Sequence, residues 1–153
     1  MENKDNIHFG FIEPIEVGIL QIINLLSKDK IYKNLPLQMI DRVLKPIQLG
    51  HYYCAIDVEH KQCVGVLIFI RISTDTAKLC IEEKREPTIY ENDADGKELF
   101  IIAIAGQSIF RLFRNFCLHH RGELILYKRH IFENKKIITH FGYIDRDGKK
   151  SKL

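Results

Sequence analysis

The sequence predicts one α+β domain built around a mixed central sheet, and three observations lead to it. The chain has 153 residues, close to the size of one average domain, and 46% of them are hydrophobic, as in an ordinary globular core. Two segments with helical spacing of apolar residues come first, and runs of β-branched and aromatic residues follow. The second half has the order strand, loop, helix, strand. We expect residues 1–153 to form this domain, with flexible ends at 1–10 and 145–153.

Two amphipathic helices are expected in the first third of the chain. The first ends at residues 27–30, and its apolar stripe consists of Ile15, Ile19, Ile22, Ile23 and Leu26. The second begins at Pro36, which a first helical turn tolerates, and ends at Gly50. Its apolar side consists of Leu37, Ile40, Val43, Leu44 and Ile47.

Strands are expected next. Residues 51–57 and 62–72 are rich in β-branched and aromatic side chains and flank a polar turn, which predicts a hairpin. A third strand is expected over residues 77–82. Residues 84–98 contain proline, glycine, asparagine and aspartate and look too polar to pack, so we expect a long surface loop there.

The second half contains the clearest helix. Residues 99–105 are almost continuously apolar, which predicts a strand covered on both faces. Ser108 is expected to cap the following helix, and Gly122 to end it. The apolar stripe of this helix consists of Ile109, Leu112, Phe113, Phe116 and Cys117. Residues 123–131 and 136–144 predict two further strands.

Composition excludes several classes of protein. The net charge of +3 is too small for a nucleic-acid binder without a concentrated patch, and the longest apolar stretch, residues 64–70, is too short to span a membrane. The N-terminus lacks the apolar core of a signal peptide, so we expect a cytoplasmic protein. Four cysteines without a C-x-x-C pair favour buried free thiols over a metal or disulfide set, and the histidines match no metal motif. We expect neither a metal nor a cofactor.

The order of the elements is similar to that of an acyltransferase of the GNAT type. In open sheets of this kind ligands gather at strand ends and helix N-termini, where unpaired N–H groups favour anions such as phosphate. Here that place is Gly106-Gln107-Ser108. Glycine there would let a phosphate or pantetheine-like donor approach the backbone, and a Gly106→Val variant is expected to fold while obstructing that approach.

The chain also resembles the RTX toxin-activating lysine acyltransferases, bacterial cytoplasmic proteins that move a fatty acyl group from acyl carrier protein to lysines of a toxin. The best match is residues 31–36, Ile-Tyr-Lys-Asn-Leu-Pro, followed at the family's intervals by Pro46 and Tyr53. Residues 100–106 match the family's central strand, 123–129 its next strand with a basic end, and 140–142 its phenylalanine–glycine element. The resemblance covers about residues 26–142.

The resemblance implies an acyltransferase that has lost its family's usual catalytic pair. The family's histidine falls at Tyr32, and its aspartate falls at Ile102. A tyrosine, with an ordinary pKa of about 10, is a poor base near neutral pH, and an isoleucine cannot orient or charge-balance anything. A divergent branch of the family matures siderophore microcins together with a larger maturation protein, and the short, Ile/Lys/Asn-rich chain is most similar to that branch.

Three functions follow from this resemblance. The preferred one is attachment of a siderophore group to a microcin precursor, the second is fatty-acyl transfer from acyl carrier protein to toxin lysines, and the third is an inactive adaptor in a maturation complex. The expected partners are a precursor peptide or toxin, a larger maturation protein and acyl carrier protein, but neither a nucleic acid nor a membrane. Exposed Arg111 and Arg114 are either a solvated helix face or a docking patch for an acidic partner.

The candidate site residues follow from position. Tyr32 is expected to act through its hydroxyl or, equally, to pack at a helix–loop junction, and His51 is the imidazole that could replace the missing one. Gly106, Gln107 and Ser108 are the candidate substrate-binding residues, although an ordinary cap also explains Ser108. Arg129 either binds an anion or ends a strand in solvent.

Overall fold

The computed structural model describes residues 6–13, 15–29, 32–33 and 37–152, with the backbone alone at 37–40 and 130–133. Pro36, the expected first-turn proline, lies outside the described residues, as does most of segment 30–36. Within these ranges the chain forms helices α1 to α4 and strands β1 to β7. None of the described helices has the length and apolar character needed to cross a membrane.

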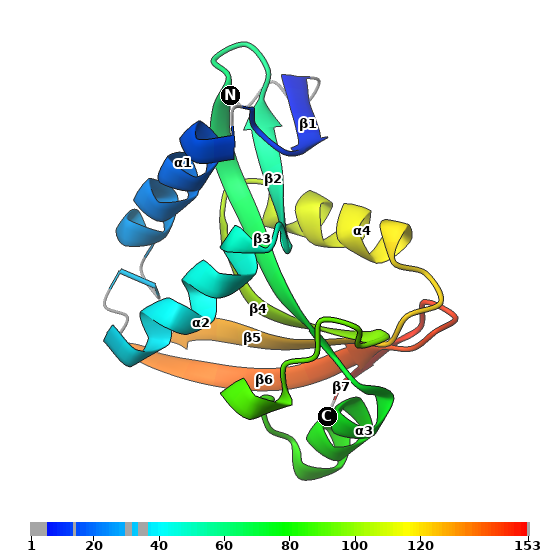
Figure 1. The fold of residues 1–153 in the computed structure, drawn as a ribbon. Helices are drawn as coiled ribbons and strands as arrows, with labels where there is room; N and C mark the ends of the chain where they lie inside the picture. The colour runs from blue at the N-terminus through cyan, green and yellow to red at the C-terminus, as the bar shows by residue number, and fades with distance from the viewer. Residues whose placement is uncertain (1–5, 14, 30–31, 34–36, 153) are drawn as a thin grey trace. The chain divides into compact units, whose positions relative to one another are not determined.

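The strands form one mixed sheet in chain order, as Figure 1 shows. They are β1 (Ile7–Gly10), β2 (Tyr52–Asp57), β3 (Gln62–Ile72), β4 (Glu98–Gly106), β5 (Ile125–Glu133), β6 (Lys136–Ile144) and β7 (Lys150–Lys152). β1, β2 and β3 pair antiparallel, as do β5, β6 and β7, whereas β4 pairs with β5 in parallel. The α+β class and the mixed sheet are confirmed.

By its contacts the chain divides into two compact units. The first comprises residues 1–68 and 103–116, and the second comprises residues 69–102 and 117–153. The long strands β3 and β4 each contribute residues to both units. The expected hairpin and the strand at 99–105 are both present, with boundaries within about one residue of those predicted.

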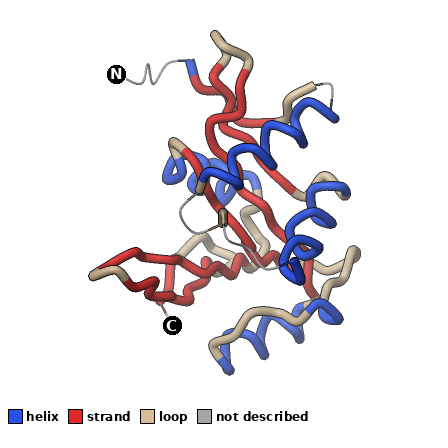
Figure 2. The backbone as a smooth tube through the Cα atoms, turned by 90° about the vertical axis from the view of Figure 1, so that its left-hand side faces the viewer, coloured by secondary structure: helices blue, strands red, loops and turns tan. Residues whose placement is uncertain are grey.

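In the first unit, helices cover both faces of β2 and β3. α1 (Ile15–Lys28) lies on one face and the start of α4 (Ile109–His119) on the other, as Figures 1 and 2 show from two directions. Phe116 of α4 is fully buried, and its ring meets Tyr53 of β2 edge-on with centroids 6.0 Å apart. The helix is predicted to pack on the sheet through Phe113 and Phe116; this is confirmed for Phe116, whereas Phe113 is half-buried. α2 (Leu37–Gln48) occupies the predicted second helical segment.

In the second unit, the strand expected at residues 77–82 is wrong, because that segment belongs to α3 (Thr74–Glu83). The hydroxyl of Ser73 accepts a hydrogen bond from the backbone N–H of Thr76 at 3.1 Å and so caps the helix start. The apolar positions 77, 80 and 81 have helical rather than alternating spacing. Ala77 and Cys80 are buried in a core that also contains Ile72. The prediction of an alternating strand period for this short apolar run is therefore wrong, because its period is helical.

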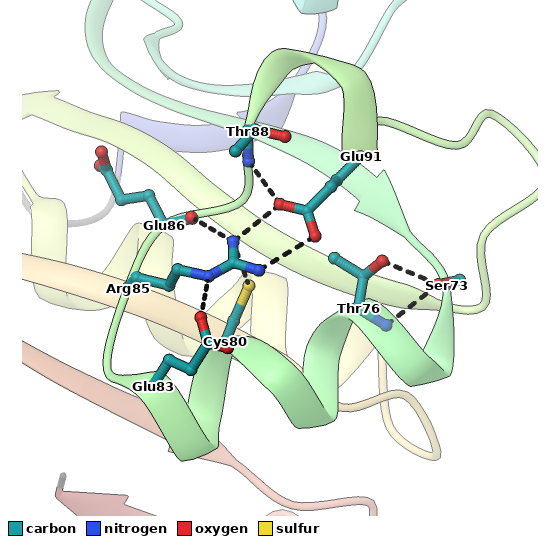
Figure 3. Close-up of polar contacts among 8 residues, drawn as sticks. All are labelled: Ser73, Thr76, Cys80, Glu83, Arg85, Glu86, Thr88 and Glu91. Carbon is teal, nitrogen blue, oxygen red and sulfur yellow. Dashed lines mark hydrogen bonds and ion pairs between the residues drawn. The ribbon is translucent and has the colours of Figure 1, made fainter.

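The segment after α3 is anchored rather than a free surface loop. Nη1 and Nη2 of Arg85 bind the two carboxylate oxygens of Glu91 at 2.7 and 3.2 Å, as Figure 3 shows. Glu91 also accepts the backbone N–H of Thr88 at 2.8 Å, and Arg85 contacts Glu83 at 2.5 Å. These bonds fold the polar residues back on themselves, so their low hydrophobicity does not prevent ordered packing.

A buried carboxylate fixes the start of β4. Glu98 is fully buried, accepts the backbone N–H of Leu124 at 3.0 Å and forms an ion pair with Arg146 at 2.8 Å. Arg146 in turn donates to the carbonyl of Gly122. Because an unpaired buried charge is costly, this network ties the entry to β5 to the turn before β7.

The sheet has edge strands near both ends of the chain. Among the described strands, β1 pairs with β2 alone, and β7 pairs with β6 alone. Both lie within the ranges expected to be flexible, 1–10 and 145–153. β1 does alternate, as Ile7-His8-Phe9-Gly10, but edge strands of three or four residues are too short for such a pattern to predict them.

We predict that Phe116→Ala lowers the free energy of unfolding by about 3–5 kcal/mol, because it removes a fully buried ring. The matched control is Phe110→Ala on the same helix, whose side chain is 74% exposed; its effect is expected to stay within about 0.5 kcal/mol. Urea denaturation measures both. Equal losses for the two variants would show that the buried face of α4 has been misassigned.

We also predict an acid-dependent contribution from Glu91. The Arg85 guanidinium lowers the pKa of Glu91 to about 2, so its ion pair stabilises the fold above about pH 4.5 and is lost as the pH falls toward about 2. Glu91→Gln should therefore lower the melting temperature at pH 7, and the gap to the wild type should close between pH 4.5 and 2. Glu82→Gln, at an exposed position on α3, is the control and should show no such gap.

Candidate functional site

The first unit contains a cavity of about 620 Å³. Its walls are the last turns of α1, the start of β3 and the end of β4. The lining residues are Gln21, Asn24, Leu25, Lys28, Asp29, Gln62, Cys63, Val64, Gly106 and Gln107. Most of these side chains are polar, so the cavity suits a ligand with several hydrogen-bonding groups and little apolar surface.

Two glycines let β3 and β4 touch at the cavity wall. A Cβ on Gly65 would collide with the carbonyl oxygen of Gln107, and a Cβ on Gly106 would collide with that of Val64. The backbone N–H of Gln107 donates to the carbonyl of Val64 at 2.7 Å. The close approach therefore requires glycine at both positions. A Gly106→Val variant cannot fold unchanged, which corrects the expectation drawn from the sequence.

The turn from β4 into α4 has an unusual backbone. Gly106 has a φ of +91° and Ser108 a φ of +58°, whereas an ordinary N-cap residue is extended. Ser108 is therefore not the conventional cap that the sequence suggested, although its carbonyl accepts the first helical bond, from Leu112 at 2.9 Å. Left-handed backbone at a residue with a side chain costs free energy and is concentrated at functional sites.

Two ionisable groups of opposite charge stand at the end of α1. Lys28 and Asp29 both line the cavity. The carboxylate of Asp29 accepts the backbone N–H of Tyr32 at 3.2 Å, which ties the segment after the helix to the cavity rim. Tyr32 itself is half-buried and is one hydrogen bond away from a lining residue. Its proposed role in catalysis stays a prediction.

The start of β3 is held against α1 by a side chain. Oε1 of Gln21 accepts the backbone N–H of Cys63 at 2.6 Å. This bond satisfies a strand N–H that would otherwise face the cavity, and it fixes the cavity wall at Cys63. Gln21 stands in the sequence as a polar residue flanked by Leu20 and Ile22, which was the available signal for an inward-facing polar group.

The structure places some of the predicted site residues at the cavity and the others elsewhere. Gly106 and Gln107 line the cavity, with Ser108 next in the chain, whereas His51 is not among the described lining residues. The N–H of His51 donates to the carbonyl of Pro46 at 2.9 Å, at the junction of α2 and β2. Arg129 is exposed on β5, in the second unit. Ile102, at the lost aspartate position, packs against the core of that unit.

Metal binding finds no support among the described residues, which contain no group of three or more potential ligands. All four cysteines are free, with Cys54, Cys63 and Cys80 buried and Cys117 half-buried. The expectation of free thiols is confirmed. Burial raises the pKa of Cys80, and burial also raises that of Cys117, to about 11, so both remain protonated near neutral pH.

The sequence matches no protein-family profile and no curated protein. Among solved structures, it is similar to mosquito arylalkylamine N-acetyltransferase-like 5b, at 17% identity over 80% of this chain and 76% of that one, with a TM-score of 0.48. A second is a GNAT-like decarboxylase, GphF, in complex with isobutyryl-CoA, at 14% identity over 80% and 64% of the two chains, with a TM-score of 0.48. This chain thus spans less than two thirds of that protein.

A third similar structure is a histone acetyltransferase HPA2 and related acetyltransferase from Corynebacterium glutamicum, at 11% identity over 80% and 75% of the two chains, with a TM-score of 0.42. All three identities are below 20%, and all three TM-scores are below 0.5. The function of this chain must therefore be argued from its own residues.

We predict that Gly106→Ala destabilises the fold more than Gly50→Ala. Both glycines have positive φ, but a Cβ on Gly50 would meet nothing within 4 Å. Gly50→Ala should cost about 1–2 kcal/mol for the left-handed backbone alone, and Gly106→Ala about 1–3 kcal/mol more for the collision with β3. Chemical denaturation of the two variants measures the difference. Equal costs would mean that the two strands do not touch at this point.

Proposed function

We propose that this protein is an acyltransferase that takes an acyl group from a phosphorylated, pantetheine-type thioester and passes it to an acceptor on a peptide or protein. The observation that carries the proposal is the polar cavity between the last turns of α1, the start of β3 and the end of β4. The order of helices and strands, and the parallel pairing of β4 with β5, are in keeping with it.

The donor end of the proposal is supported by charge and hydrogen bonding. α4 begins two residues after Gln107 of the cavity wall, and the dipole at a helix start favours an anion such as phosphate. On the cavity wall, Lys28 adds a positive charge. The amide side chains of Gln62 and Gln107 suit the amide groups of a pantetheine arm.

The chemistry requires an acceptor that loses a proton. An amine or hydroxyl of the acceptor attacks the thioester carbonyl, the C–S bond breaks, and the donor leaves as a thiol that takes up the proton. Asp29 is the carboxylate on the cavity wall, and in this proposal it takes over the general-base role of the family's missing histidine. Tyr32 would orient the carbonyl through its hydroxyl. His51 is not among the residues that line the cavity, so this proposal gives it no role.

The narrower proposal is that the acceptor is a bacterial toxin precursor. The resemblance of residues 31–36, Pro46 and Tyr53 to the toxin-activating acyltransferases favours this acceptor, and the loss of the family pair favours siderophore attachment to a microcin over lysine acylation. In this proposal a larger maturation protein completes the assembly. A neighbouring gene for a glycine- and serine-rich peptide would support the microcin function, whereas a gene for a large repeat toxin would support lysine acylation.

We predict that the chain binds coenzyme A through Lys28. Lys28→Ala should weaken binding about tenfold or more, because a hydrogen bond to a charged group contributes about 1.5–3 kcal/mol. The same variant should leave binding of pantetheine, which has no phosphate, unchanged. The control is Lys45→Ala, because Lys45 is exposed on α2 and does not line the cavity. Calorimetric titration measures all three, and equal affinity of wild type and Lys28→Ala for coenzyme A would contradict the donor site.

Measuring the release of the donor thiol distinguishes the proposed acyltransferase from an inactive adaptor. With the precursor peptide and the larger maturation protein present, release of the donor thiol should fall about a hundredfold in Asp29→Asn, within the usual contribution of a general base. Tyr32→Phe should lower turnover with unchanged thermal stability. Donor binding without any turnover in the wild type would favour the inactive adaptor instead.

A further inference from the structure

Two buried thiols share one face of the β2–β3 hairpin in the first unit. Tyr53 of β2 points toward α4, so the next residue, Cys54, points to the opposite face, which α1 covers. Cys63 of β3 lies opposite Ile56, two residues from Cys54 and on the same face. The pairing is irregular here, with Val64 as the extra residue between the pairs Ala55–Gly65 and Ile56–Cys63.

The two thiols are diagonal neighbours on this buried face, because Cys63 pairs with Ile56, two residues from Cys54. Each thiol shifts the pKa of the other, as adjacent groups do, and Sγ of Cys63 donates to the carbonyl of Gly65 at 3.2 Å. The irregular pairing at Val64 is where a small shift of β3 and a rotation of the side chains would join the two sulfurs. Neither cysteine is needed for the acyl transfer proposed above, so the pair is a separate feature of the fold.

The two sulfurs differ in access and acidity. Cys54 has no exposed surface, whereas Cys63 is 8% exposed and lines the cavity. The neighbouring Cys63 thiol, together with burial, raises the pKa of Cys54. The Cys54 thiol lowers the pKa of Cys63 against the effect of burial. Cys63 is thus the thiol that a reagent reaches first and the one that ionises more readily.

We propose that Cys54 and Cys63 form a reversible dithiol–disulfide site, with Cys63 as the attacking thiol and Cys54 as the resolving thiol. The Cys63 thiolate attacks one sulfur of a small disulfide such as oxidised glutathione, which enters through the cavity, and one glutathione thiolate leaves. Cys54 then loses its proton and attacks Sγ of Cys63, which expels the second glutathione. Two protein thiols lose two electrons and two protons, and one glutathione disulfide becomes two glutathione thiols.

Oxidation at this site acts on the cavity wall. Joining Sγ of Cys63 to Cys54 draws that sulfur away from the carbonyl of Gly65, while the backbone N–H of Cys63 is still held by Gln21. Gly65 is also the residue at which β3 meets β4. Oxidation of the pair is therefore expected to change the shape of the cavity wall between Gln62 and Gly65.

The test is oxidation of the full-length, folded protein in glutathione buffers. After incubation at a series of reduced-to-oxidised ratios, acid quenching and alkylation, intact mass should show loss of two hydrogens, with two thiols still alkylated. Peptide mapping should then assign the bridge to Cys54 and Cys63 and leave Cys80 and Cys117 alkylated. Alkylation of all four thiols in the most oxidising buffer, or a bridge between any other pair, overturns the proposal; neither result depends on a variant that must fold.

The variants test the order of the two steps. Cys54→Ser should accumulate a stable mixed disulfide of glutathione on Cys63, because the resolving thiol is gone. Cys63→Ser should accumulate none on Cys54, which has no exposed surface. Cys80→Ser is the matched control at a buried cysteine outside the pair and should form the bridge as the wild type does. Glutathione on Cys54 in folded Cys63→Ser would contradict the assigned order.

Discussion

The contact of β3 with β4 at two glycines is the constraint on which the first unit depends. The carbonyl of Val64 accepts the N–H of Gln107, and neither Gly65 nor Gly106 leaves room for a side chain. The end of β4 is thereby fixed before the chain turns through left-handed backbone into α4. This close contact between β3 and β4, which only glycine permits, fixes the cavity wall, the position of Gln107 and the start of α4.

Periodicity in the sequence predicts the parts of this fold that bury an amphipathic face. The apolar runs of the hairpin and of β4 are long enough to predict strands. The stripe of α1 predicts the helix, and Ile22 and Leu26 are buried as expected, but Ile15 and Ile23 of the same stripe are exposed. The sequence does not predict α3, because its two buried positions, Ala77 and Cys80, are too few to distinguish a helical period from an alternating one. The edge strands β1 and β7 have only four and three residues and no fully buried side chain, so their sequences are too short to predict a strand.

The site is less predictable because its residues come together only through tertiary contacts. Gly106 and Gln107 could be found, since a strand that runs into a helix places their backbone at a strand end. The sequence does not identify three other lining residues, Lys28, Asp29 and Cys63. Each is an ordinary residue at the end of a helix or strand, and only the packing of α1 against β3 brings them together. The resemblance to the toxin-activating acyltransferases pointed instead to Tyr32, and the loss of their histidine pointed to His51 as a substitute. Tyr32 is one hydrogen bond from the cavity rim, and the backbone of His51 is bound to Pro46 in the α2–β2 turn.

The irregularity in the hairpin connects the cavity with the thiol pair. If Val64 paired regularly with Ile56, the alternation of β3 would place Cys63 opposite Asp57 and turn its side chain to the other face of the hairpin. The same extra residue supplies the carbonyl that receives Gln107. One added residue therefore sets both the contact that ends β4 and the face on which Cys63 meets Cys54. A change that forced Val64 into regular pairing with Ile56 would move the thiol and the cavity wall together, so both features are consequences of one local departure from regular pairing.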